Sequence, residues 1–95
     1  ELTQDELIYT HLVRATDIDM GRHMNNVVYI RLLLDCLPAK ELASGRIKSI
    51  EAHYASPCLE GETLGVFCRR EERLCRMAVR HADGRPAVLA QIVFR

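Results

Sequence analysis

The fold is decided by the stretch Thr16–Leu37, TDIDMGRHMNNVVYIRLLLDCL, in which a loop runs into the most apolar segment of the chain. Its first half has no hydrophobic periodicity, which is typical of a loop. Asn25 or Asn26 can cap the free N–H groups at the start of a helix. Pro38 disfavours helical geometry in the residue before it. The sequence therefore predicts a helix over Asn26–Leu37.

This predicted helix is apolar on almost every side. Its polar side chains beyond the first residue are those of Tyr29, Arg31 and Asp35. Arg31 and Asp35 are four residues apart, so they lie along one edge of the helix. A helix that is apolar nearly all round must be buried on several sides. We therefore expect the rest of the chain to wrap around it.

The rest of the chain predicts strands. Apolar and polar residues alternate in segments separated by turn signals such as Glu60-Gly61 and Asp83-Gly84. The expected strands are Ile8–Ala15, Ile47–Ala55, Thr63–Arg70, Leu74–His81 and Pro86–Phe94. Residues 1–7 are interpreted as a linker or first turn. We expect a single α+β domain over residues 1–95, with one long buried helix wrapped by a five-stranded antiparallel sheet that continues from the helix as a meander.

Composition excludes several classes of protein. The chain has 95 residues, of which 48% are apolar and 27% are charged, as in ordinary globular domains. No apolar run approaches the roughly 20 residues that span a bilayer, and the acidic start ELTQDEL is unlike a signal peptide. The four cysteines form no CxxC or CxxH pair, so they fit reduced core thiols better than a zinc site. We expect a cytoplasmic domain with no membrane contact, metal or dissociable cofactor.

Charge is balanced overall but uneven along the chain. There are 13 basic and 13 acidic residues, and arginine is concentrated in residues 62–95. This concentration is a weak indication of an anionic partner, and solvated strand faces are the favoured interpretation. No aromatic residues interleave the arginines, so nucleic-acid binding is not expected.

The loop and helix start resemble a known family. The run Asp17–Tyr29, DIDMGRHMNNVVY, resembles the signature D-x-D-x-x-x-H-x-N-N-x-x-Y of hot-dog thioesterases. It is most similar to the second hot-dog half of acyl-acyl-carrier-protein (acyl-ACP) thioesterases. The resemblance implies a hot-dog fold and the hydrolysis of fatty acyl-ACP thioesters to a free fatty acid and the carrier thiol.

The sequence also departs from this family. Gly21 stands where those enzymes usually carry an asparagine. Pro57, in the segment Tyr54–Cys58, stands where they usually carry a glutamate. Both family residues have been assigned catalytic roles. The family is a tandem of two hot-dog halves, and this chain resembles the second of them.

The resemblance places the chemistry where the loop meets the helix. Asp19 and His23 match the catalytic aspartate and histidine of the family. A carboxylate can activate water or orient the histidine, and a neutral histidine is a suitable base near pH 7. The unpaired N–H groups at the helix start can stabilise an oxyanion. The residues expected to bind substrate are Asn25, Asn26, Val27, Tyr29 and Arg22, of which the asparagines are also helix caps.

Other candidate residues have a structural interpretation beside the functional one. Cys58 is a candidate nucleophile paired with His23, although a small buried apolar residue is the favoured interpretation. Asp17 is interpreted as a turn former. The histidines on the predicted strands have no companion ligands in the sequence, so no site role is assigned to His11, His53 and His81.

Three functional hypotheses follow from these residues. The first is hydrolysis of fatty acyl-ACP. The second is an acyl-CoA or aryl-CoA thioesterase of the wider hot-dog group, in which Asp19 acts as nucleophile or base and Gly21 is easily accommodated. The third is a hot-dog domain that binds acyl groups or only dimerises, its catalysis lost with the family asparagine and glutamate. Because hot-dog sites form between two units, a homodimer or a tandem partner half is expected.

Overall fold

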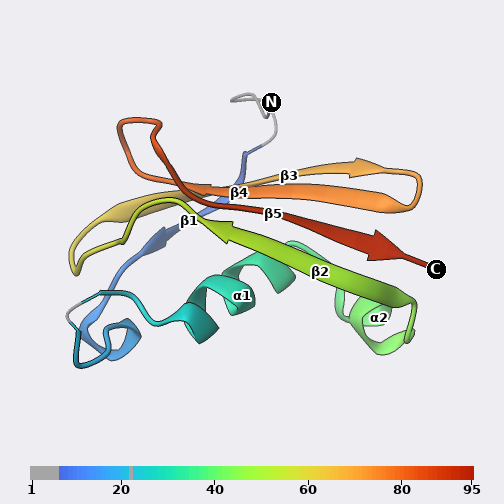
Figure 1. Ribbon diagram of the computed structural model, residues 1–95, viewed down its shortest axis with the longest axis horizontal. Coiled ribbons are helices and arrows are strands. Elements are labelled where there is room, and N and C mark those ends of the chain that lie inside the picture. The colour runs from blue at the N-terminus through green and yellow to red at the C-terminus, as the bar shows by residue number, and fades with distance from the viewer. Residues whose placement is uncertain (1–6, 22) are drawn as a thin grey trace.

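The computed structural model describes residues 7–21 and 23–95, and its main feature is one five-stranded antiparallel sheet. The strand order is β1-β3-β4-β5-β2, and helix α1 lies across one face of the sheet (Figure 1). The strands are β1 (Leu7–Leu12), β2 (Ile47–Tyr54), β3 (Thr63–Glu71), β4 (Leu74–Arg80) and β5 (Pro86–Phe94). The helices are a 3₁₀ turn over Ala15–Asp17, α1 (Asn26–Leu34) and α2 (Ala39–Ala43).

The predicted five-stranded antiparallel sheet is confirmed, but the predicted meander is wrong for β2. This strand follows α1 and pairs with β5 at one edge, while β1 pairs with β3 at the other. Only β3, β4 and β5 follow one another as neighbours, because tight turns join them. The ends of β2 and β3 are three strand spacings apart, roughly 14 Å. Residues 55–62 connect them and are long enough to cover that distance.

The long buried helix predicted over Asn26–Leu37 is not found. Helix α1 ends at Leu34, because the N–H groups of Cys36 and Leu37 bond to carbonyls three residues back, at 3.1 and 3.0 Å. This tighter turn ends the helix before Pro38 excludes it. A second helix, α2, follows Pro38 and was not predicted.

Burial of α1 is also less complete than expected. Val28, Tyr29, Leu32 and Leu33 form one buried stripe that faces the sheet. On the other side, Val27 is 72% exposed. The sheet covers one face of α1 rather than wrapping it, so Val27 remains open among the described residues.

The hydrophobic core lies between α1 and the inner face of the sheet. Its largest fully buried side chains include Leu33 from α1, Leu64 from β3, Met77 from β4 and Ile92 from β5. The core holds the start of α1 beside the loop that follows β2, and the candidate site lies there. No helix of the described residues is long and apolar enough to span a membrane.

Candidate active site

The start of α1 is capped by Asn25, one of the two asparagines that the sequence offers for this position. Its side-chain Oδ1 accepts a hydrogen bond from the N–H of Val27 at 2.7 Å, and its carbonyl accepts from the N–H of Val28 at 2.9 Å. Asn26 and Val27 are exposed. The first turn of the helix therefore presents its positive end at the surface, where a carbonyl oxygen can approach it.

Asp19 and His23 lie on a small closed loop immediately before this helix start. The backbone N–H of Asp19 bonds to the His23 carbonyl at 3.1 Å, and Ile18 and Met24 form a β-bridge beside it. Both Asp19 and His23 are exposed. The backbone therefore brings the two predicted catalytic residues together, although the described hydrogen bonds include none between their side chains. Arg22 lies outside the described residues.

Gly21 shapes this loop around Asp19. The Gly21 N–H donates to Asp19 Oδ1 at 2.8 Å. A Cβ atom at position 21 would meet the same oxygen at 3.2 Å, a tight contact. The glycine thus leaves room for the Asp19 carboxylate to fold back on the loop, and a side chain at position 21 would press against that carboxylate.

Asp17, interpreted as a turn former, is buried in a bonded network. Its Oδ2 accepts from the N–H of Arg14 at 3.1 Å and lies 2.8 Å from His11 Nε2. Burial disfavours the charged carboxylate, but these hydrogen bonds and the nearby charge of Arg31 outweigh it and hold the pKa of Asp17 below its ordinary value. The Asp17 carbonyl accepts from the N–H of Asn25 at 2.9 Å, so this network also positions the helix cap.

Cys58 is fully buried beneath the helix start. Its carbonyl accepts from the Met24 N–H at 3.0 Å, and its own N–H donates to the Tyr29 hydroxyl at 3.0 Å. Burial raises the pKa of the Cys58 thiol, which disfavours the thiolate that a nucleophile needs. Tyr29, predicted to bind substrate, is buried and packs edge-to-face on Tyr54 with ring centroids 5.7 Å apart.

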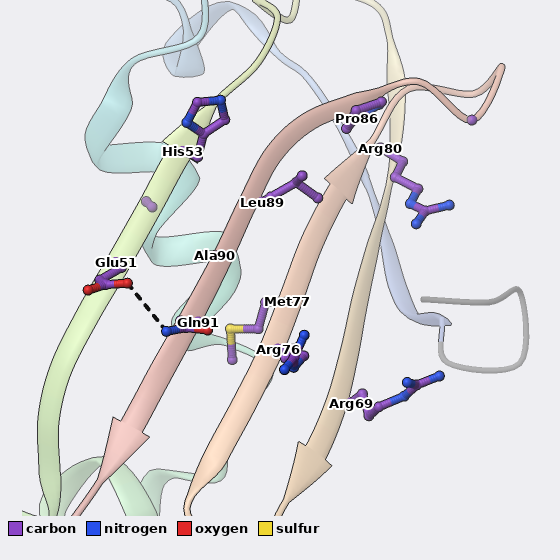
Figure 2. A pocket seen from close by; sticks show the side chains of 12 residues that line it. Glu51, His53, Arg69, Arg76, Met77, Arg80, Pro86, Leu89, Ala90 and Gln91 are labelled. Atoms are coloured by element: carbon purple, nitrogen blue, oxygen red, sulfur yellow. Dashed lines mark hydrogen bonds between the residues drawn. The ribbon is translucent and has the colours of Figure 1, made fainter. Parts of the chain in front are cut away.

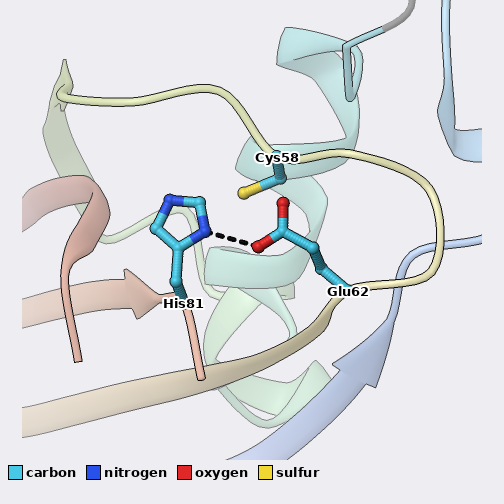
Figure 3. Close-up of side chains that lie close together, drawn as sticks. All are labelled: Cys58, Glu62 and His81. Carbon is cyan, nitrogen blue, oxygen red and sulfur yellow. Dashed lines mark hydrogen bonds and ion pairs between the residues drawn. The ribbon is translucent and has the colours of Figure 1, made fainter. Parts of the chain in front are cut away.

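The acidic and imidazole groups beside the Cys58 thiol belong to Glu62 and His81, and Figure 3 shows the three side chains converging. His81 Nδ1 lies 2.6 Å from Glu62 Oε1, and His81 Nε2 lies 2.8 Å from Ser56 Oγ. Sequence reasoning assigned no role to His81 and missed Glu62. The available signal was the predicted hairpin of β3 and β4, which returns the chain to the end where β3 begins.

A cavity lies elsewhere, on the face of the sheet away from α1. It is a shallow groove of about 670 Å³ whose lining includes Arg69, Arg76 and Arg80 (Figure 2). The arginine-rich C-terminal segment noted in the sequence therefore places three of its charges on one face. Arg80 lies over the Phe67 ring at 5.1 Å, and Arg76 reaches Glu71 at 3.9 Å.

Comparisons with known proteins agree with this architecture. The family model of the acyl-ACP thioesterase C-terminal domain matches residues 1–95. An oleoyl-acyl carrier protein thioesterase of Coriandrum sativum is 36% identical over 45 residues, which cover 47% of this chain and 12% of that protein.

Two solved structures share the fold. An acyl-ACP thioesterase from Bacteroides thetaiotaomicron aligns with a TM-score of 0.89 and 24% identity, covering 100% of this chain and 40% of that one. A Staphylococcus aureus protein solved in complex with CoA aligns with a TM-score of 0.76 and 15% identity, covering 92% of this chain and 72% of that one. These alignments confirm the predicted hot-dog fold. This chain thus spans about two fifths of the length of the bacterial acyl-ACP thioesterase.

Proposed function

We propose that this chain, which belongs to the acyl-ACP thioesterase C-terminal domain family, is the catalytic half of a thioester hydrolase that acts on fatty acyl-ACP. The observation that carries the proposal is the position of the motif residues. Asp19 and His23 lie on one closed, exposed loop that leads directly into the capped start of α1. The loop can supply a base, and the helix start can supply positive charge for an oxyanion.

The reaction follows from these groups. The thioester carbonyl lies against the start of α1, where the positive end of the helix dipole stabilises the negative oxygen that forms when water attacks. The N–H groups of Val27 and Val28 are already bonded to Asn25, so the dipole rather than these donors provides the stabilisation. Asp19 or His23 takes a proton from the attacking water, and that proton then passes to the departing thiolate. The products are a carboxylic acid and the carrier thiol. The exposure of both residues gives water and substrate access.

Cys58 takes a supporting part in this proposal. Its thiol is buried, whereas its backbone joins Met24 and Tyr29 and so fixes the helix start. Val27 and Asn26 are exposed at the first turn and are the residues that we assign to substrate contact.

The site is completed by a second hot-dog unit, either another copy of this chain or a tandem half. Three large apolar side chains near the open edge remain exposed in the described chain: Val27 at 72%, Ile50 at 40% and Tyr54 at 44%. Strand β2 also leaves one edge of the sheet unpaired among the described strands. Open edges and contiguous apolar surface are features that proteins cover.

The alternative substrate is an acyl-CoA or aryl-CoA thioester. It is favoured by the fold shared with a protein that was solved with CoA, and by Gly21, which leaves room for Asp19 without the family asparagine. We further propose a cytosolic location, since all four cysteines are free.

Thiol release by the purified protein tests the activity and the carrier together. The same acyl chain is presented on ACP and on CoA, at equal concentrations. Faster turnover of acyl-ACP supports the proposed substrate, and faster turnover of acyl-CoA supports the alternative. Tight binding of both without turnover would contradict hydrolysis and support a domain that only binds acyl groups, as Gly21 and Pro57 in place of the family residues suggest.

A further inference from the structure

The cluster of Cys58, Glu62 and His81 brings two hydrogen-bond acceptors into close contact. Ser56 Oγ donates its single hydrogen to the Pro86 carbonyl at 2.8 Å. His81 Nε2, also 2.8 Å from Ser56 Oγ, must then be the donor in that contact. Because a neutral histidine carries one ring hydrogen, Nδ1 is left as a lone pair facing Glu62 Oε1 at 2.6 Å. Only a positive charge between these two acceptors makes such a contact favourable, either a proton or a metal ion.

The third side chain of the cluster decides between these occupants. The Cys58 sulfur, a Glu62 carboxylate oxygen and a His81 ring nitrogen all lie within 4.8 Å of one another (Figure 3). Thiolate, carboxylate and imidazole are the three ligand types of zinc sites. Ligands of a tetrahedral zinc lie roughly 3.3–3.8 Å apart, since their bonds to the metal are about 2.0–2.3 Å long. Side-chain shifts of roughly 1 Å would therefore close the cluster around an ion.

The side chains of His81 and Glu62 are already oriented by a second partner, and the backbone of Cys58 is held in place. His81 is held through Nε2 by Ser56, and the other carboxylate oxygen of Glu62 accepts from the Leu59 N–H at 2.7 Å. The backbone N–H of Cys58 is bonded to Tyr29. Such outer partners fix the tautomer and orientation of metal ligands in proteins.

We propose that Cys58, Glu62 and His81 form a binding site for a divalent metal ion, with zinc as the cation that best matches this ligand set. The ion takes the place of the proton between His81 and Glu62, and Cys58 binds as a thiolate. The thiol proton of Cys58 is therefore released when the ion binds. The site goes beyond the proposed hydrolysis. It clamps the loop before β3 to the end of β4, beneath the start of α1.

Spacing in the sequence predicts no such site, because the ligands come from separate segments. Cys58 and Glu62 belong to the connection before β3, whereas His81 follows β4. The antiparallel pairing of β3 with β4 brings these ends together.

Cobalt(II) titration of the metal-free protein tests the proposal. A tetrahedral site with a thiolate ligand produces a sulfur-to-cobalt charge-transfer band, which zinc then bleaches at one equivalent. Cys58→Ser is expected to abolish the band, and Ser56→Ala to weaken zinc binding about 10–100-fold by releasing His81. Cys68→Ser is the matched control, because Cys68 lies beside Cys75 in a different cluster, with a sulfur–sulfur distance of 2.7 Å.

A band that survives in Cys58→Ser, or one that is lost in Cys68→Ser, would overturn the assignment. So would the absence of any stoichiometric metal binding, which would leave the proton as the occupant. His81→Gln provides a second reading if Cys58→Ser does not fold, since it must also lose stoichiometric zinc binding while circular dichroism reports a folded sheet.

Discussion

At the scale of single residues, Tyr29 connects the helix start to the loop before β3. Its hydroxyl is the partner of the buried Cys58 N–H at 3.0 Å, and burial raises its pKa, so the hydroxyl stays neutral. The loop and the helix therefore hold each other in place through one buried bond.

Removing that hydroxyl leaves a buried donor without a partner. We expect Tyr29→Phe to lower the free energy of unfolding by about 1–3 kcal/mol, measured by urea denaturation. Tyr54→Phe is the matched control, because it keeps the ring contact and alters a residue that is 44% exposed. Equal losses in the two variants would contradict the role assigned to the Tyr29 hydroxyl.

Asp17 predicts a dependence of stability on pH. The pKa of Asp17 is lowered in the folded protein. Its carboxylate therefore contributes fully to the free energy of unfolding above the unfolded-state pKa of about 3.9, and this contribution is lost as the pH falls through the folded-state pKa. We expect Asp17→Asn to lower the free energy of unfolding at pH 6. At pH 3 we expect a smaller difference in this free energy between the variant and the unmodified chain. Denaturation at both pH values measures this. If the two proteins differ in free energy of unfolding as much at pH 3 as at pH 6, the charged Asp17 carboxylate is not the cause of the difference.

The residues of the loop were largely predictable, and those of the buried cluster were not. The cap Asn25 and the proximity of Asp19 to His23 follow from local spacing, because neighbours in a loop are also neighbours in space. The catalytic roles of Asp19 and His23 come from the family resemblance and stay a prediction. The partners of Cys58 are set by the register of β3 and β4, which the sequence does not specify to the residue. The contact of Asp17 with His11 was missed for the same reason, since it joins a strand to the turn after it.

At the scale of elements, α1 is anchored by the buried stripe that faces the sheet. Leu33 is 1% exposed and lies in the buried stripe that faces the sheet, whereas its neighbour Leu34 is only partly buried. We expect Leu33→Ala to cost about 2–5 kcal/mol of stability in thermal or urea unfolding. Leu34→Ala, the control, should cost clearly less. A larger loss from Leu34→Ala would mean that the other face of α1 is the covered one.

Strands were predicted better than helices. The bounds of β5 match the sequence interpretation, and the other strands differ at their ends, because alternation and turn residues are local signals. Helix α2 was not predicted, because it is short and is stabilised by a contact with a residue that is distant in the sequence. Glu41 in α2 forms a two-bonded ion pair with Arg70 of β3, at 2.5 and 2.8 Å, which no local pattern reveals.

At the scale of the whole molecule, the sheet order explains why the chain is expected to need a partner. Placing β2 at the edge leaves Ile50 and Tyr54 exposed beside a helix whose Val27 is also open. The apolar character of α1 was predicted correctly from the sequence. The prediction that this chain's own sheet would bury the helix on several sides was wrong. This exposed apolar surface is where we propose that a second hot-dog unit docks.

We therefore expect the isolated chain to self-associate. Light scattering at micromolar concentration should report a dimer, and Ile50→Lys should shift it to a monomer by placing a charge on the apolar edge. Lys48→Ile, at an already exposed position of β2, controls for a general effect of changing this strand. A clean monomer of the unmodified protein would contradict the homodimer.

The most direct test of the account is thiol release from acyl-ACP by three pairs of samples. Asp19→Asn is compared with Asp35→Asn, an exposed aspartate at the other end of α1, and His23→Ala is compared with His53→Ala, an exposed histidine on β2. The unmodified protein is measured with and without its carrier substrate. We expect Asp19→Asn and His23→Ala to lose about 10²–10⁴-fold in turnover, as general acid–base residues do, while both controls remain active. Full turnover in both site variants would show that hydrolysis does not occur at the loop before α1.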